Sequence, residues 1–84
     1  MFYYLIVCRS LTQAQQTAAA LERSGITAHL LRTPKELTER GCGYSVKIAE
    51  RNLKGALVAL NRAELSPTRL YRTVGDGSYR EVAL

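Results

Sequence analysis

Apolar and polar positions divide the chain into short strands and two longer amphipathic helices. Residues 2–8 are apolar or aromatic at nearly every position, which is typical of a central strand covered on both faces. Residues 44–48 alternate instead, with the even positions expected to face the core and Ser45 and Lys47 to face outward. The pattern predicts four strands, at residues 2–8, 26–32, 44–48 and 68–74.

Apolar residues recur three or four positions apart in two segments, which predicts helices over residues 12–24 and 50–64. Ser10 or Thr12 is the expected N-cap of the first helix, and Gly25 its stop. A Thr-Pro-Lys-Glu sequence at residues 33–36 is typical of a helix start and predicts a short helix that ends near residue 39 or 40. The expected buried stripes are Ala14, Ala18 and Leu21, and then Leu53, Ala56, Leu57 and Leu60.

This order of elements predicts an α+β fold of the ferredoxin-like, split βαβ sandwich type. The expected antiparallel sheet has the order 4-1-3-2, with the helices on one face and an extra short helix before strand 3. Residues 1–84 are expected to form a single domain with a core over about 2–74. Residues 75–84 are a turn and a C-terminal arm, for which a hairpin and a frayed end are both open readings.

Composition narrows the function classes. The formal net charge is +5, from 12 Lys and Arg against 7 Asp and Glu, without a clustered basic run. Two cysteines cannot form a disulfide scaffold or a four-thiolate metal site within the chain. The sequence also has no phosphate loop and no metal-binding motif, so no metal and no cofactor are expected. The apolar opening is too short for a membrane span and lacks the basic start of a signal peptide, which predicts a cytoplasmic protein with reduced thiols.

Cys42 is the strongest candidate for chemistry. Gly41 and Gly43 flank it and leave its thiol sterically open. In the expected topology, strands 1 and 3 are antiparallel neighbours, so Cys42 lies near Cys8 and near the start of the first helix. A helix N-terminus and nearby cations stabilise a thiolate. The expected supporting residues are Ser10, Arg9, Arg32 and Arg40, with Lys47 as a further cation. The alternative is a cysteine that a glycine-rich turn merely tolerates.

Other residues carry weaker signals. Cys8 ends a hydrophobic strand and reads as a small core residue, with reversible pairing to Cys42 as the alternative. His29, the one histidine, has no visible catalytic partner and is expected at the surface of an edge strand. The tyrosines on strands are expected in packing or at a dimer face rather than stacked on bases, because the aromatic and basic pattern of RNA-binding strands is missing. Nucleic-acid binding through the net charge of +5 is therefore the third of the readings, after the two given below.

Several of these residues carry a family resemblance. An apolar strand ends in Ser10, a helix leads to Ser24-Gly25-Ile26, a Thr-Pro-Lys-Glu-Leu segment occupies 33–37, and Cys42-Gly43 enters a strand. In these features the chain resembles the small selenium/sulfur carrier protein-like family.

The resemblance implies that Cys42 holds sulfur or selenium as a persulfide or selenosulfide and passes it between a donor and an acceptor protein. It implies a carrier rather than a turnover enzyme. The alternative function is a non-enzymatic, ferredoxin-like interaction or regulatory module. A homodimer is expected because the helix-free face of the first strand needs cover from the C-terminal arm or from a second subunit.

Overall fold

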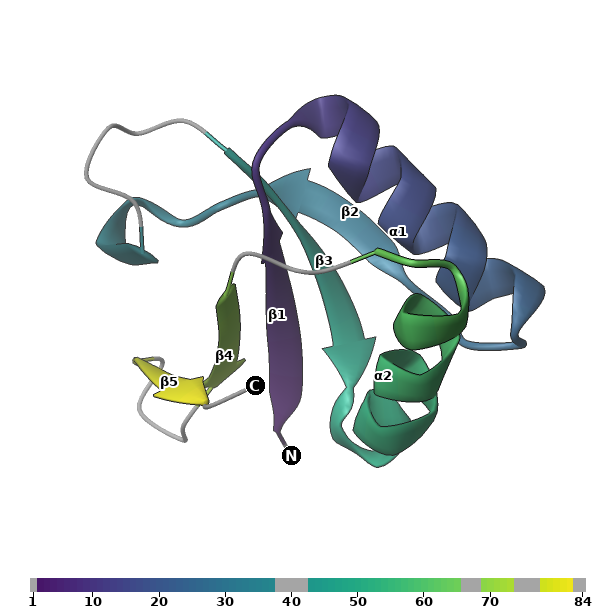
Figure 1. The fold of residues 1–84 in the computed structure, drawn as a ribbon. Helices are drawn as coiled ribbons and strands as arrows, with labels where there is room; N and C mark the ends of the chain where they lie inside the picture. Colours follow the sequence, from purple (N-terminus) through teal and green to yellow (C-terminus); the bar gives the residue numbers. More distant parts are fainter. Residues whose placement is uncertain (1, 38–42, 66–68, 74–77, 83–84) are drawn as a thin grey trace.

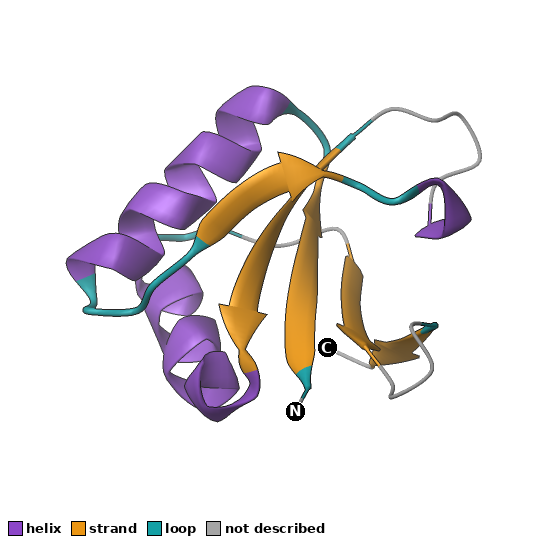
Figure 2. Ribbon diagram, turned by 180° about the vertical axis from the view of Figure 1, so that it is seen from behind, coloured by secondary structure: helices purple, strands orange, loops and turns teal. Residues whose placement is uncertain are grey.

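The computed structural model describes residues 2–37, 43–65, 69–73 and 78–82. Within these ranges, five strands form one antiparallel sheet, and two α-helices pack together on one of its faces (Figure 1; Figure 2). The strands are β1 (Tyr3–Cys8), β2 (His29–Arg32), β3 (Tyr44–Ala49), β4 (Arg69–Thr73) and β5 (Tyr79–Val82). The helices are α1 (Leu11–Arg23) and α2 (Leu53–Arg62), with single 3-10 turns η1 (Lys35–Leu37) and η2 (Glu50–Asn52).

The sheet order is β2-β3-β1-β4-β5. The predicted mixed α+β class and antiparallel sheet are therefore confirmed. The predicted four-stranded order 4-1-3-2 and the ferredoxin-like sandwich are not confirmed in that form, because the sheet has a fifth strand. β5 pairs with β4 from Leu70 opposite Val82 to Thr73 opposite Tyr79. Of the two readings for the C-terminal arm, the hairpin is confirmed for Tyr79–Val82.

Helix α1 follows from its two ends. Ser10 is the N-cap, and its Oγ accepts a hydrogen bond from the Gln13 backbone N–H, so the helix starts one residue earlier than predicted. At the other end Gly25 has φ +80°, and the Ile26 N–H donates to the Leu21 carbonyl at 2.9 Å. This capping bond holds Ile26 at the helix end, so β2 begins at His29 rather than at the predicted residue 26.

The second helix is shorter than predicted. Its first turn is the 3-10 turn η2, and it ends at Arg62, where Glu64 takes the left-handed position with φ 57°. The Leu65 N–H then donates to the Leu60 carbonyl at 2.9 Å. Leu57, predicted to be buried, is 38% exposed, and Ala59 is buried in its place.

The main core lies between the helices and the sheet. Alternate residues of β1 point into it, together with Val46 and Ile48 of β3 and Leu70 of β4. The helices supply the opposite side, with Ala14, Leu21, Ala56 and Leu60 fully buried. The predicted inward alternation of β3 is confirmed for Val46 and Ile48, because neither side chain exposes more than 1% of its surface.

The helix-free face of β1 is already covered within one chain. Leu5 points to that face, opposite Lys47 on one side and Tyr71 on the other, and it is 1% exposed. Leu5 therefore needs no second subunit for its cover, and the expected homodimer stays a prediction. Of its two cross-strand partners, Tyr71 is buried and Lys47 is half-buried.

Candidate functional site

One end of the sheet brings together most of the residues that the sequence singled out. Cys8 at the end of β1 lies opposite Tyr44 at the start of β3, and Arg32 at the end of β2 lies on the other side of Tyr44. Helix α1 starts three residues after Cys8. The predicted approach of the end of β1 to the start of β3 is confirmed, so the residue that follows Cys42 sits at the edge where α1 begins.

Gly43 occupies a position that favours glycine. Its φ is +127°, a conformation that residues with a side chain rarely adopt. A Cβ at Gly43 would lie 3.5 Å from Thr33 Oγ1 and 3.8 Å from the Cys8 carbonyl oxygen. The Thr33 N–H donates to the Gly43 carbonyl at 3.1 Å. Gly43 is thus a fixed, closely packed anchor between the ends of β1 and β2.

A buried pair of hydroxyls reinforces this anchor. Thr33 Oγ1 and Ser45 Oγ lie 2.7 Å apart, and the two residues expose 7% and 0% of their surface. Ser45 was predicted to face solvent, and this is wrong. Thr33, in the segment after β2, covers Ser45 on the helix-free face of the sheet. The sequence pattern placed Thr33 at the start of a short helix and Ser45 on the outward side of a strand, so it missed this pair.

The start of α1 presents a positive helix end near Gly43. The Arg9 N–H donates to Gln13 Oε1 at 2.7 Å, and Ser10 Oγ accepts from the Gln13 N–H at 3.1 Å. The first turn contains no acidic side chain, so nothing within it offsets the positive end of the helix dipole. Ser10 acts in the structure as a helix cap.

Cys8 is a core thiol. It is free, 2% exposed, and its Sγ lies 3.7 Å from the Ile6 carbonyl oxygen and 3.8 Å from Thr17 Oγ1. Burial raises the pKa of the Cys8 thiol, and the hydrogen bond to Thr17 offsets part of that rise. A buried thiol with a raised pKa is a poor nucleophile at neutral pH. The reading of Cys8 as a small core residue fits this geometry.

The remaining predicted site residues fall into two groups. Arg9 and Arg32 are exposed and lie at the same end of the sheet as Gly43. Lys47 does not join them, because it lies three positions along β3 from Tyr44. Arg40, Gly41 and Cys42 lie outside the described residues, as does the predicted end of the short helix at residue 39 or 40. Their roles, and any pairing of Cys42 with Cys8, stay predictions.

Metal binding and membrane insertion are two further classes to consider. In the described ranges, no group of three or more His, Cys, Asp or Glu side chains is arranged to hold a metal ion. The helices within those same ranges are too short or too polar to cross a membrane.

Comparison with known proteins gives one match. Neither the curated proteins nor the solved structures contain a match to this chain. A family model described as "Putative Se/S carrier protein-like" matches residues 3–72, which run from the first residue of β1 to the penultimate residue of β4. That match spans more than half of the 84 residues and includes Cys42, Gly43 and both long helices. The chain therefore belongs to the Se/S carrier protein-like family.

Proposed function

We propose that the protein carries sulfur or selenium on the thiol of Cys42 and hands it from a donor protein to an acceptor protein. One observation about the two cysteines carries this proposal. Cys8 is buried, with a raised pKa, which leaves Cys42 as the candidate thiol in a family described as Se/S carriers.

The chemistry is an exchange without net oxidation. The Cys42 thiolate attacks the outer sulfur of a persulfide on the donor protein, a new S–S bond forms to Cys42, and the donor cysteine leaves as a thiolate. An acceptor thiolate then attacks the outer sulfur on Cys42 and regenerates the Cys42 thiolate. A selenosulfide is formed and passed on in the same way when selenium is the outer atom.

The surroundings of Gly43 support this role. The positive end of α1 begins at Ser10, and the exposed Arg9 and Arg32 lie at the same end of the sheet. A positive potential lowers the pKa of a cysteine thiol and stabilises the anionic outer atom of a persulfide. Gly43, which follows Cys42 in the sequence, lies against Thr33 and the Cys8 carbonyl.

The wider setting of the proposal follows from the same chemistry. A reducing compartment such as the cytoplasm keeps the carrier thiol reduced and able to react. Exchange between proteins needs a docking surface rather than a deep cleft, so we infer a carrier rather than a turnover enzyme. We also infer that β1 to β4 with α1 and α2 form a ferredoxin-like core, to which β5 is an addition.

The direct test is loading by a persulfide-bearing donor, such as a cysteine desulfurase supplied with cysteine. Intact mass spectrometry should show a gain of one sulfur atom in the wild type and in Cys8→Ala, and no gain in Cys42→Ser. Reductant should release the atom. Equal loading of Cys42→Ser and wild type would contradict the proposal, as would a wild type that never gains the atom.

A second candidate function, an interaction module that dimerises, has one observation in its favour. β2 is an edge strand of the sheet, and its Leu30 is 41% exposed. An exposed apolar side chain on an edge strand favours pairing with a second copy. Light scattering of wild type and Leu30→Lys at micromolar concentration tests this, since a dimer lost in the variant supports it and a monomeric wild type excludes it.

A further inference from the structure

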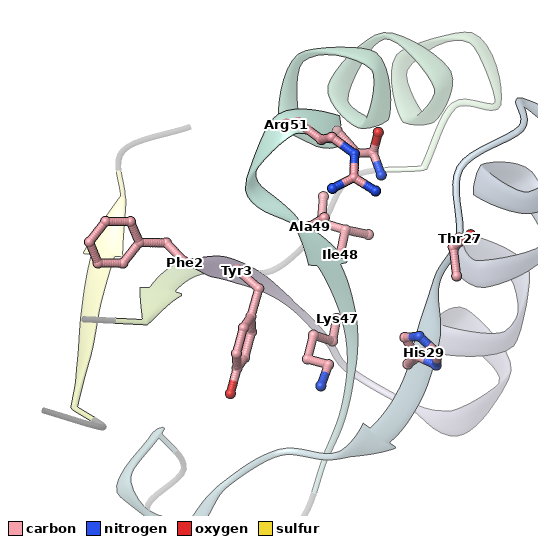
Figure 3. A pocket seen from close by; sticks show the side chains of 9 residues that line it. Phe2, Tyr3, Thr27, His29, Lys47, Ile48, Ala49 and Arg51 are labelled. Atoms are coloured by element: carbon pink, nitrogen blue, oxygen red, sulfur yellow. The ribbon is translucent and has the colours of Figure 1, made fainter. Parts of the chain in front are cut away.

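A hollow lies at the end of the sheet opposite to Gly43. It has a volume of about 320 Å³ and is formed where β1 starts, β2 starts and β3 passes into η2 (Figure 3). That volume is at the lower end of the range for small-molecule sites. Lys47 is the lining residue of β3 nearest to Gly43, and the four residue steps between these positions span about 13 Å at the strand rise of ~3.3 Å per residue. The hollow is therefore distinct from the proposed thiol site.

Three basic side chains face this hollow from different elements. His29 of β2 and Lys47 of β3 are direct partners across the two strands, which puts their Cβ atoms about 5 Å apart. Arg51 comes from η2, and in Figure 3 its guanidinium lies at the η2 end of the hollow, whereas the Lys47 amine points away from it, beside the Tyr3 ring. None of the nine residues that line the hollow is acidic. The hollow therefore has a cationic wall without a built-in counter-charge.

Tyr3 positions one of these cations. Lys47 Nζ lies 4.6 Å from the centre of the Tyr3 ring, and both side chains are half-buried. A cation over an aromatic face is attracted by the ring. This attraction favours the position of the Lys47 amine beside Tyr3, at the wall of the hollow. Tyr3 and its cross-strand partner Ala49 also give the hollow a carbon-rich side.

We propose that this hollow binds a small organic phosphate, with the phosphate groups on Lys47, Arg51 and His29 and the carbon-rich part against Tyr3 and Ala49. The guanidinium fork of an arginine matches two phosphate oxygens, and a lysine amine adds a point charge. Phosphate fits better than a purely apolar ligand because Lys47, Arg51 and the His29 ring all offer N–H donors to the hollow, and none of its lining residues is acidic. The proposal is independent of sulfur or selenium transfer.

The experiment is a calorimetric titration of the full chain at low salt with four probes: ADP, inorganic pyrophosphate, adenosine and a short single-stranded RNA. The matched variants are Lys47→Gln and Lys54→Gln. Both variants remove one positive charge. Lys54 lies on α2 and does not line this hollow, so Lys54→Gln is the control for net charge. Circular dichroism checks that both variants keep the fold.

The expected result is saturable binding of ADP, weaker binding of pyrophosphate and no binding of adenosine. Lys47→Gln should weaken ADP binding by about tenfold, which is the effect of one charge-assisted hydrogen bond. Lys54→Gln should change it by less than about twofold, because its charge acts only at long range through solvent.

Three outcomes would overturn the proposal. The first is a wild type that binds neither ADP nor pyrophosphate. The second is equal weakening by Lys47→Gln and Lys54→Gln, which would show attraction to the net charge rather than a site. The third is tighter binding of a short single-stranded RNA than of ADP, weakened by both variants, which would make this face a nucleic-acid surface.

Discussion

The hydroxyl pair beneath the Gly43 anchor offers the sharpest test of how the sheet end is held together. Thr33→Val keeps the shape of the side chain and removes its hydroxyl, and Ser45→Ala does the same on β3. The two oxygens lie 2.7 Å apart, and neither residue is more than 7% exposed. Each single variant leaves the remaining hydroxyl buried without this partner.

The magnitude follows from that burial. A buried polar group left unpaired costs about 1–3 kcal/mol of unfolding free energy. A chain of this length has a total of on the order of 4–13 kcal/mol, so each single variant removes a measurable fraction. The double variant Thr33→Val with Ser45→Ala leaves neither hydroxyl behind. We expect it to be more stable than the sum of the single effects predicts, with a coupling of about 1 kcal/mol.

Urea unfolding followed by circular dichroism measures all four members of this cycle. Each single variant should lower the unfolding midpoint by roughly 1 M, because small domains have slopes of about 1–3 kcal/mol per M. Thr12→Val, an exposed threonine on α1, is the control and should combine additively with Ser45→Ala. Additive effects for Thr33→Val with Ser45→Ala would refute the reasoning, because they would show that the two hydroxyls do not depend on each other.

Three further predictions concern single positions. Gly43→Ala should lower the unfolding free energy by roughly 1–3 kcal/mol, because of its φ of +127°, and should slow persulfide loading. Gly25→Ala, with φ +80° and nothing within 4 Å of the added Cβ, should also destabilise the fold but leave loading unchanged. Urea midpoints and loading rates measured on both variants separate these two effects. Glu64→Gly should raise the melting temperature, because it relieves a left-handed residue that costs about 1 kcal/mol. The raised pKa of Cys8 means that the unfolded thiol ionises first, so stability is complete below the ordinary value of 9.0 and falls as pH rises above it. Cys8→Ala should flatten that alkaline loss in urea midpoints measured from pH 7 to 11, and an unchanged slope would argue against the buried thiol as its cause.

Local patterns in the chain predicted the two long helices and the strands, and the errors lie mostly at the ends of elements. The N-terminal boundary of β2 is the clearest case. Ile26 is apolar and β-branched, which favours a strand, but its N–H caps α1 through the Leu21 carbonyl. Capping bonds of this kind outweigh strand propensity, so β2 begins three residues later.

The candidate site was predictable where it depends on which strands are neighbours. Placing β1 beside β3 was enough to put Cys8 and the start of α1 at the same edge as Gly43. The buried hydroxyl pair was not predictable, because the alternation of β3 shows which face Ser45 points to and not what covers that face. The cationic hollow was missed for a similar reason, since Lys47 was assigned to the thiol end of the sheet.

By itself, the sequence determined the features set by near neighbours in the chain: the helix stripes, the Ser10 cap and the Gly25 stop. It also distinguished Cys8, which ends an apolar strand, from Cys42, which glycines flank. Only the tertiary structure decided which exposed-looking positions are buried and which cations share a surface. Ser45 is covered by Thr33, which is twelve residues away in the sequence. Lys47 of β3 lies opposite His29 of the neighbouring strand β2. Burial and charge clustering are properties of residues distant in the chain, so no local pattern of apolar and polar positions can contain them.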